Sequence, residues 1–150
     1  MKILMVCLGN ICRSPLAEGI LKEKIEKYDL DWEVDSAGTG HWHAGEKPDP
    51  RSIAVGKNYG IDISRQRARQ IKPKDLDYYD HILVMDDSNL RDVQQMASND
   101  CQKKKIRRIL ELSESSDDIQ NVPDPYYDDN GFEYVFRLLD NACDQLIRKL

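Results

Sequence analysis

The stretch that decides the fold comes first in the chain: Lys2-Ile3-Leu4-Met5-Val6-Cys7-Leu8-Gly9-Asn10-Ile11-Cys12-Arg13-Ser14-Pro15. Its apolar first half is typical of a strand that is buried on both faces of a parallel sheet. Pro15 is a favoured first helical residue, so a helix is expected to begin there. A loop between such a strand and such a helix turns backbone N–H groups toward one centre. The stretch therefore predicts an anion-binding loop at the end of a buried strand.

Strands and helices alternate along the rest of the sequence. Apolar runs predict strands at residues 2–8, 32–37, 81–85 and 106–110, and apolar residues at helical spacing predict helices that begin near Pro15, Pro50, Ser88 and Phe132. We therefore expect one α/β domain over residues 1–150, a three-layer sandwich with helices on both faces of a four-stranded parallel sheet. Ligands of such sheets bind at the carboxyl ends of the strands, where the Cys7 loop lies.

Local signals also predict details of three helices. The charged residues between positions 22 and 27 are expected to form a solvated face of the first helix. Asp49 is the expected N-cap of the second helix, with Ile53 and Ala54 facing inward. Asp87-Ser88 is the expected cap of the third helix.

Composition and charge exclude several classes of protein. With 150 residues, 40% hydrophobic and 33% charged, the chain is long and apolar enough for one folded domain. Its net charge of −5 argues against broad binding to nucleic acid or to anionic membranes. No apolar run approaches the length of a membrane span, and the first residues lack the cleavage site of a signal peptide. We expect a cytoplasmic monomer with reduced thiols.

The cysteines and histidines do not have the pattern of a metal site. A zinc site needs a close pair of ligands plus further ligands, and Cys7 and Cys12 have no partner pair downstream. His41 and His43 have no third ligand nearby. We therefore expect no metal and no cofactor. Cys143 lies on the apolar stripe of the last helix and is expected in the core, while Cys101 is expected to be a surface thiol.

Cys7 and Arg13 are two of the three parts that cleavage of a phosphate ester needs. A thiolate is the reactive nucleophile, and loop N–H groups, a helix N-terminus and the charge on Arg13 all favour the ionised form. Arg13 offers a planar fork to two phosphoryl oxygens, and Ser14 is placed to donate its hydroxyl to the sulfur. Gly9 and Asn10 tolerate the left-handed backbone that lets the loop curl. Taken alone, Cys7 would be a buried structural thiol; its spacing from Arg13 favours the nucleophile.

Cys12 has two interpretations that the sequence leaves open. It is placed to form a reversible disulfide with Cys7 under oxidation, which would protect the thiolate from over-oxidation. Alternatively, it is a small residue that faces the interior of the loop.

The third part is an acid that protonates the leaving oxygen, and Asp124 is the candidate. Pro123 and Pro125 flank it on a long loop, which limits its freedom. It would protonate the ester oxygen in the first step and deprotonate water in the second. Tyr126 and Tyr127 follow it and offer flat walls to an aromatic leaving group. A plain turn is the alternative, and a calcium loop is excluded because Asp129 stands where glycine is required.

Three segments resemble the low-molecular-weight protein tyrosine phosphatase family. They are Cys7–Pro15, Ser36-Ala37-Gly38-Thr39-Gly40 and Asp124-Pro125-Tyr126-Tyr127, and the likeness extends over essentially the whole chain. The resemblance implies a sheet with flavodoxin-like winding and hydrolysis of phosphotyrosine and small aryl phosphates. It also implies a phosphocysteine intermediate at Cys7, Arg13 bound to the phosphoryl group, Asp124 as acid and then base, and no metal.

The resemblance also implies a set of substrate-binding residues. Asn10 would hold the shape of the loop through contacts that include Ser36, and Trp42 would lie at the rim opposite the two tyrosines. The full set is Leu8, Gly9, Asn10, Ile11, Cys12, Ser14, Ser36, Trp42, Tyr126 and Tyr127. The partner implied is a tyrosine-phosphorylated protein, with a tyrosine kinase among the candidates.

Two other activities are known on this fold. Arsenate reductases use a further pair of cysteines after the third strand, and residues 85–97 contain none. Phosphoarginine phosphatases tend to carry a smaller polar residue at the position of Ile11 and lack the paired tyrosines. Ile11 with Tyr126-Tyr127 favours a flat aromatic substrate. A catalytically silent phosphotyrosine-binding module is disfavoured because both Cys7 and Asp124 are present.

Overall fold

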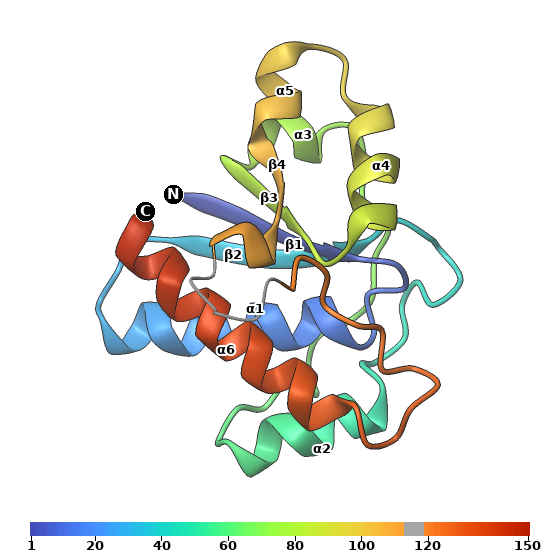
Figure 1. Cartoon of the computed structure of the whole chain (residues 1–150), viewed down its shortest axis with the longest axis vertical. Helices are drawn as coiled ribbons and strands as arrows, with labels where there is room; N and C mark the ends of the chain where they lie inside the picture. The colour runs from blue at the N-terminus through green and yellow to red at the C-terminus, as the bar shows by residue number, and fades with distance from the viewer. Residues whose placement is uncertain (113–118) are drawn as a thin grey trace.

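A four-stranded parallel sheet forms the centre of the protein in the computed structural model, which describes residues 1–112 and 119–150 (Figure 1). Its strands are β1 (Lys2–Cys7), β2 (Glu33–Gly38), β3 (His81–Val84) and β4 (Ile106–Arg108), in the order β2-β1-β3-β4. The chain moves to one side of β1 for β2 and to the other side for β3 and β4. The strand order therefore reverses beside β1, where open α/β sheets bind their ligands. The predicted fold class is confirmed.

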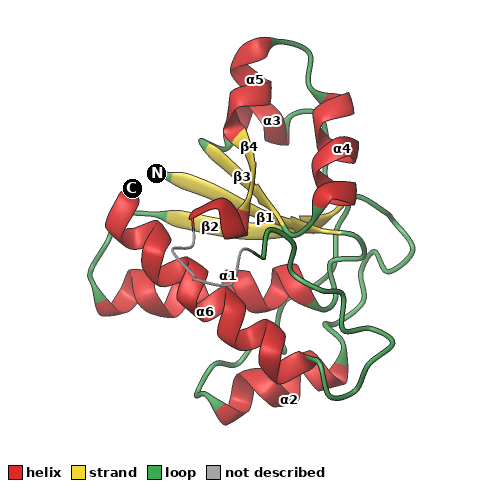
Figure 2. Cartoon of the chain, in the orientation of Figure 1, coloured by secondary structure: helices red, strands yellow, loops and turns green. Residues whose placement is uncertain are grey.

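Helices cover both faces of the sheet (Figure 2). On one face lie α1 (Arg13–Lys27), α2 (Pro50–Asn58) and α6 (Phe132–Lys149); on the other lie α3 (Asp75–Tyr78), α4 (Asp87–Met96) and α5 (Asp100–Lys105). A short 3₁₀ helix, η1 (Ile109–Leu112), follows β4. Alternate residues of β1 enter different cores: Ile3, Met5 and Cys7 pack on the α1 side, and Leu4 and Val6 pack on the other.

Several predicted boundaries shift by one or two residues. The first helix begins at Arg13, two residues before Pro15, because the N–H groups of a first helical turn need no partner within the helix and proline is accommodated there. The cap of α4 is Asp86 and not Asp87-Ser88, since the Asp86 carboxylate accepts the Asn89 N–H at 2.8 Å. The fourth strand ends at Arg108, where the 3₁₀ turn begins. The helices α3 and α5 were not predicted, because four to six residues are too few to show a helical period.

Two predictions about helix faces are wrong, one of them in part. Asp49 caps α2 as expected, and Ile53 is half-buried and packs against the core, but Ala54 is exposed and the buried residues of the helix are Ser52, Val55 and Gly56. On α1, Lys24 is not merely solvated, because it reaches the α6 carboxylates of Asp140 and Asp144 at 2.8 Å each. Burial lowers the pKa of Lys24, but the hydrogen bonds that it donates to both carboxylates raise it by more, to about 12.

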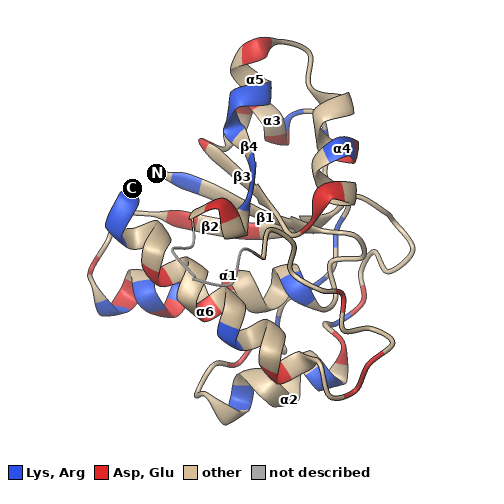
Figure 3. Ribbon diagram, viewed as in Figure 1, with Lys and Arg blue, Asp and Glu red and all other residues tan. Residues whose placement is uncertain are grey.

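The apolar face predicted for the last helix is the face of α6 that packs into the core. Its apolar residues from Phe132 to Leu146 are buried, including Cys143, while Leu150 is exposed, and the helix packs against α1, α2 and η1. Lys and Arg are interspersed with Asp and Glu over the described residues, apart from a basic stretch at 103–108 on α5 and β4 (Figure 3). Within the described part of the chain, none of the helices combines the length and the apolar character needed to span a bilayer.

Candidate active site

The loop after β1 wraps around the sulfur of Cys7. Cys7 is 2% exposed, and its Sγ lies 3.0 Å from Ser14 Oγ and accepts the N–H of Asn10 at 3.3 Å. Asn10 has a φ of +58°, the left-handed conformation that its sequence position was expected to tolerate. Gly38 on β2 lies directly beside this loop: a Cβ at this position would lie 2.8 Å from the Leu8 carbonyl oxygen. The loop can therefore close only against a glycine.

Asn10 connects the loop to the rest of the protein. Its side-chain nitrogen Nδ2 donates to Ser14 Oγ at 2.8 Å and to Ser36 Oγ at 3.0 Å, and its side-chain oxygen Oδ1 accepts the backbone N–H of Arg69 at 3.0 Å. The contact with Ser36 is the one that the family resemblance implied. Asn10 is 2% exposed, so these bonds form away from water and rigidify the loop.

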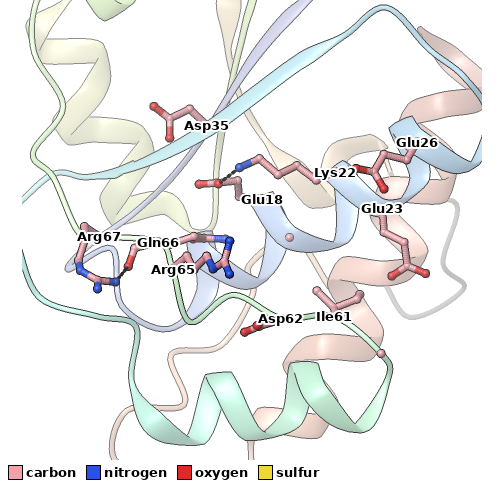
Figure 4. A pocket seen from close by; sticks show the side chains of 12 residues that line it. Glu18, Lys22, Glu23, Glu26, Asp35, Ile61, Asp62, Arg65, Gln66 and Arg67 are labelled. Carbon is pink, nitrogen blue, oxygen red and sulfur yellow. Dashed lines mark hydrogen bonds and ion pairs between the residues drawn. The ribbon is translucent and has the colours of Figure 1, made fainter.

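A buried carboxylate, Glu18, continues this network and was missed in the sequence. Ser36 Oγ donates to Glu18 Oε1 at 2.6 Å, and Lys22 Nζ pairs with Glu18 Oε2 at 2.6 Å. Glu18 is only 3% exposed and lies at the back of a hollow of about 440 Å³ between α1 and residues 60–67 (Figure 4). The other end of this network reaches Cys7, through Ser36, Asn10 and Ser14.

Arg13 is held rigidly beside the loop. Its Nη1 donates to Asp86 Oδ2 at 2.6 Å and to the Val122 carbonyl at 2.9 Å, and its side chain is 3% exposed. Burial lowers the pKa of the guanidinium, but the Cys7 sulfur and the Asp86 carboxylate raise it by more, so the net direction is upward. Asp86 was also missed in the sequence, although its place directly after the third apolar run put it at the carboxyl edge of the sheet.

Asp124 and Arg13 both line a cavity at the cysteine loop, which is separate from the hollow beside Glu18. Its Oδ2 lies 3.8 Å from Arg13 Nη2, and its Oδ1 accepts the Tyr126 N–H at 3.1 Å. The side chain is 40% exposed, which leaves it open to solvent and to a ligand. The sequence predicted that this carboxylate, 117 positions after Cys7, would meet the cysteine loop, and both line one cavity.

That cavity holds about 330 Å³. The cysteine loop and Arg13 lie on one side, and aromatic residues form the rim. Its lining comprises Cys7, Leu8, Gly9, Ile11, Cys12, Arg13, Trp42, His43, Asp124, Tyr126 and Tyr127. The remaining predicted residues do not line the cavity: Asn10 and Ser14 are part of the loop, Ser36 lies on β2, and the hydrogen bonds among them hold the loop in shape.

The rim is aromatic and exposed. Trp42 is 65% exposed and Tyr127 is 92% exposed, while Tyr126 packs edge-on against Tyr127 with ring centroids 4.9 Å apart. His43 also lines the cavity and pairs with Glu46, a role that the sequence did not reveal. Large aromatic surface left in water at the mouth of a cavity is suited to a flat ligand.

The other cysteines are thiols of different character. Burial, with the Asp49 carboxylate and Cys7 nearby, raises the pKa of Cys12 to about 12. Burial likewise raises the pKa of Cys143 to about 12, and this residue is in the core as predicted. Cys101 is exposed, also as predicted. Among the described residues, no group of three or more potential ligands could hold a metal ion.

Comparisons with known proteins place the chain in a family. The sequence model of the family described as low molecular weight phosphotyrosine protein phosphatase matches residues 2–150. The protein-tyrosine-phosphatase YfkJ of Bacillus subtilis is 40% identical over 99% of this chain and 94% of its own, and the phosphatase of Sus scrofa is 37% identical over 99% and 94%.

Solved structures agree with this assignment. A protein tyrosine phosphatase from Entamoeba histolytica superposes with a TM-score of 0.93 at 37% identity, over 99% of this chain and 96% of its own. A Drosophila arginine phosphatase superposes with a TM-score of 0.92 at 33% identity, over 99% and 97%. The protein is thus an enzyme of the phosphoric monoester hydrolase class, a protein-tyrosine phosphatase. More narrowly, the chain belongs to the low molecular weight phosphotyrosine protein phosphatase family, as its three motifs predicted.

Proposed function

We propose that this enzyme hydrolyses phosphotyrosine and small aryl phosphates in two steps, through a phosphocysteine at Cys7. The observation that supports it most is the convergence of Cys7, Arg13 and Asp124 on one cavity of about 330 Å³. The nucleophile and the anion clamp come from one loop and the acid comes from a distant one, and a structural thiol would need neither the clamp nor the acid.

In the first step the Cys7 thiolate attacks phosphorus and the bond to the aryl oxygen breaks. Asp124, in its acid form, gives its proton to that oxygen, so a neutral phenol leaves. Arg13 donates to the phosphoryl oxygens as negative charge builds on them. Asp86 and the Val122 carbonyl already hold one of its nitrogens, so little reorganisation is needed.

In the second step the same carboxylate accepts a proton from water. The oxygen of that water attacks phosphorus, the sulfur–phosphorus bond breaks, and phosphate and the thiolate are released. Ser14 Oγ, 3.0 Å from the sulfur, stabilises the thiolate as it leaves. Asn10 keeps Ser14 in place through its amide.

The rim supports an aromatic substrate. Trp42, Tyr126 and Tyr127 offer ring faces at the mouth of the cavity, and Ile11 adds an apolar wall. The macromolecular substrate proposed is a tyrosine-phosphorylated protein. Phosphoarginine is the competing substrate, because one structural neighbour is named an arginine phosphatase.

A substrate panel tests this function. Peptides with phosphotyrosine, phosphoserine and phosphoarginine, and arsenate with a thiol reductant, would each be assayed with the parent and Cys7→Ser proteins in the presence of a chelator. We expect kcat/KM to be highest for phosphotyrosine and turnover to vanish in Cys7→Ser. A preference for phosphoarginine, reduction of arsenate, or turnover by Cys7→Ser would contradict the proposal.

A further inference from the structure

Arg51, in the first turn of α2, bridges the two loops of the active site. One of these is the cysteine loop, residues 7–14; the other is the acid loop, residues 123–131, which passes beside the N-terminal end of α2 (Figure 1). Arg51 Nη2 donates to the backbone carbonyl of Tyr126 at 2.9 Å, and Nη1 pairs with Asp129. Its guanidinium carbon also lies 4.6 Å from the ring centroid of Phe132. One side chain therefore contacts the middle and the end of the acid loop.

The other side of Arg51 is fixed by Asp49. The Asp49 carboxylate caps α2 by accepting the Arg51 N–H at 2.9 Å, and it also accepts from the guanidinium Nε at 3.0 Å and Nη2 at 2.9 Å. This bidentate geometry is strong and directional. The hydrogen bonds from Arg51 lower the pKa of the Asp49 carboxyl, so it stays charged.

The same turn of α2 is attached to the cysteine loop. The Asp49 N–H donates to the Ile11 carbonyl at 2.8 Å, and Ser52 Oγ donates to the Cys12 carbonyl at 3.2 Å. Ser52 is fully buried, which makes this attachment rigid. Because the start of α2 is bonded to the cysteine loop, Arg51 keeps a fixed position relative to that loop.

The acid loop has few other attachments. Within the described part of the chain, the remaining backbone hydrogen bonds of residues 125–130 join the loop to itself, as from Asp128 N–H to the Pro125 carbonyl at 2.9 Å, and the Gly131 carbonyl accepts the Val135 N–H of α6 at 3.1 Å. Tyr126 connects Arg51 to the acid: its carbonyl accepts from Arg51, and its N–H donates to Asp124 Oδ1 at 3.1 Å. Asp124 itself is 3.8 Å from Arg13, too far for a hydrogen bond to fix it.

We propose that Arg51 is a positioning residue of the reaction, which places Asp124 over the phosphate site by holding the Tyr126 carbonyl. This role rests on the proposed function, since it acts through the acid step. A general acid must lie within hydrogen-bond reach of the leaving oxygen, and a displacement of about 1 Å costs about 10²-fold in rate. The contribution of Arg51 to the reaction rate is therefore largest for substrates whose leaving group needs a proton.

Leaving groups of different basicity test this role. Phenyl phosphate needs a proton on its oxygen, whereas 2,4-dinitrophenyl phosphate releases a stable anion. For Arg51→Met we expect kcat/KM to fall about 10-fold to 100-fold with phenyl phosphate and to stay within about threefold with the dinitrophenyl ester. Arg137→Met is the matched control, because Arg137 pairs with Glu133 on its own helix, and it should leave both values unchanged. Arg51→Lys keeps the positive charge but loses the planar guanidinium, and it should show the same selective loss with phenyl phosphate. It replaces Arg51→Met in this test if that variant does not fold.

A double-mutant cycle separates positioning from a general structural effect. In an Asp124→Asn background, Arg51→Met should cause no further selective loss with phenyl phosphate, because the acid it places is already absent. Equal losses with both esters, or losses that add to those of Asp124→Asn, would overturn the role of Arg51. Absence of activity in the parent protein with both esters would instead contradict the proposed function.

Discussion

Arg13 donates to Asp86 at 2.6 Å, so the residue that clamps the phosphoryl group in the proposed reaction is itself held by the residue that caps α4. The two roles of Asp86 use different oxygens: Oδ2 faces Arg13 and Oδ1 accepts the Asn89 N–H. The carboxyl end of β3 is thereby tied to the loop after β1. This arrangement makes the orientation of the clamp independent of the ligand.

Asp86→Asn should keep the helix cap and weaken the clamp. Asparagine is as good a cap as aspartate, but it removes the carboxylate charge that lies 2.6 Å from the buried guanidinium. We expect kcat/KM to fall on the order of 10-fold to 100-fold, equally for all leaving groups. Asp86→Ala should show the same catalytic loss plus about 1 kcal/mol of stability in urea unfolding, the value of the cap. A loss in Asp86→Asn that depends on the leaving group would contradict this role.

Glu18→Ala should destabilise the protein from the far end of the network. The substitution leaves the buried Ser36 hydroxyl without its acceptor and removes the partner of Lys22. We expect a loss of about 1–3 kcal/mol in urea unfolding, together with lower kcat/KM because Asn10 loses a fixed neighbour. Glu23→Ala, an exposed change on the same helix, is the control and should stay within about 0.5 kcal/mol. Equal effects of the two substitutions would show that the network carries no stability.

The buried thiol of Cys143 predicts a stability that falls at alkaline pH. Burial raises its pKa from 9.0 to about 12 in the folded protein. Between these two values the unfolded chain has lost the proton and the folded chain keeps it, so the folded state binds more protons and stability falls as pH rises. Urea unfolding at pH 8 and pH 10.5 should therefore show a smaller loss in Cys143→Ala than in the parent. Identical losses in the two proteins would rule out this contribution.

Asp124→Asn should slow the cleavage of phenyl phosphate by about 10²–10⁴-fold. The substitution keeps an oxygen that can accept the Tyr126 N–H, so the shape of the loop is preserved while the proton is lost. Binding of inorganic phosphate, measured by calorimetry, should change little. An unchanged rate would transfer the acid role to a neighbour such as Asp128 or Asp129.

The parts of the site that are close in sequence were predictable, and the parts joined by packing were not. The strand, loop and helix start within residues 2–15 follow from hydrophobic run, spacing and turn chemistry, and Asp124 could be assigned because its flanking prolines and tyrosines form a motif. Asp86, Glu18 and Arg51 carry no local signal of their partners. An Asp after a strand, a Glu in a helix and an Arg after a helix cap are common in sequences, and their partners here lie far away along the chain, so only the folded structure shows these contacts.

The same limit explains the errors in the helices. A period needs several turns to appear, so α3 and α5 were not recognised, and the inward face of α2 depended on its neighbours. Gly56 is buried there, and only glycine fits, because a Cβ at this position would lie 2.8 Å from the Ile61 carbonyl oxygen. The apolar pattern alone favoured Ala54, which is exposed.

The central claim is a covalent bond between phosphorus and Cys7, and trapping it is the most direct test. Asp124→Ala enzyme, slowed in the second step, would be mixed rapidly with 2,4-dinitrophenyl phosphate, quenched in acid, digested and analysed by mass spectrometry, with Cys12→Ala included so that the peptide holds a single thiol. We predict one phosphoryl group on Cys7 and a burst of phenolate that matches it in amount. Continued turnover with no phosphoryl group on that peptide would contradict the account.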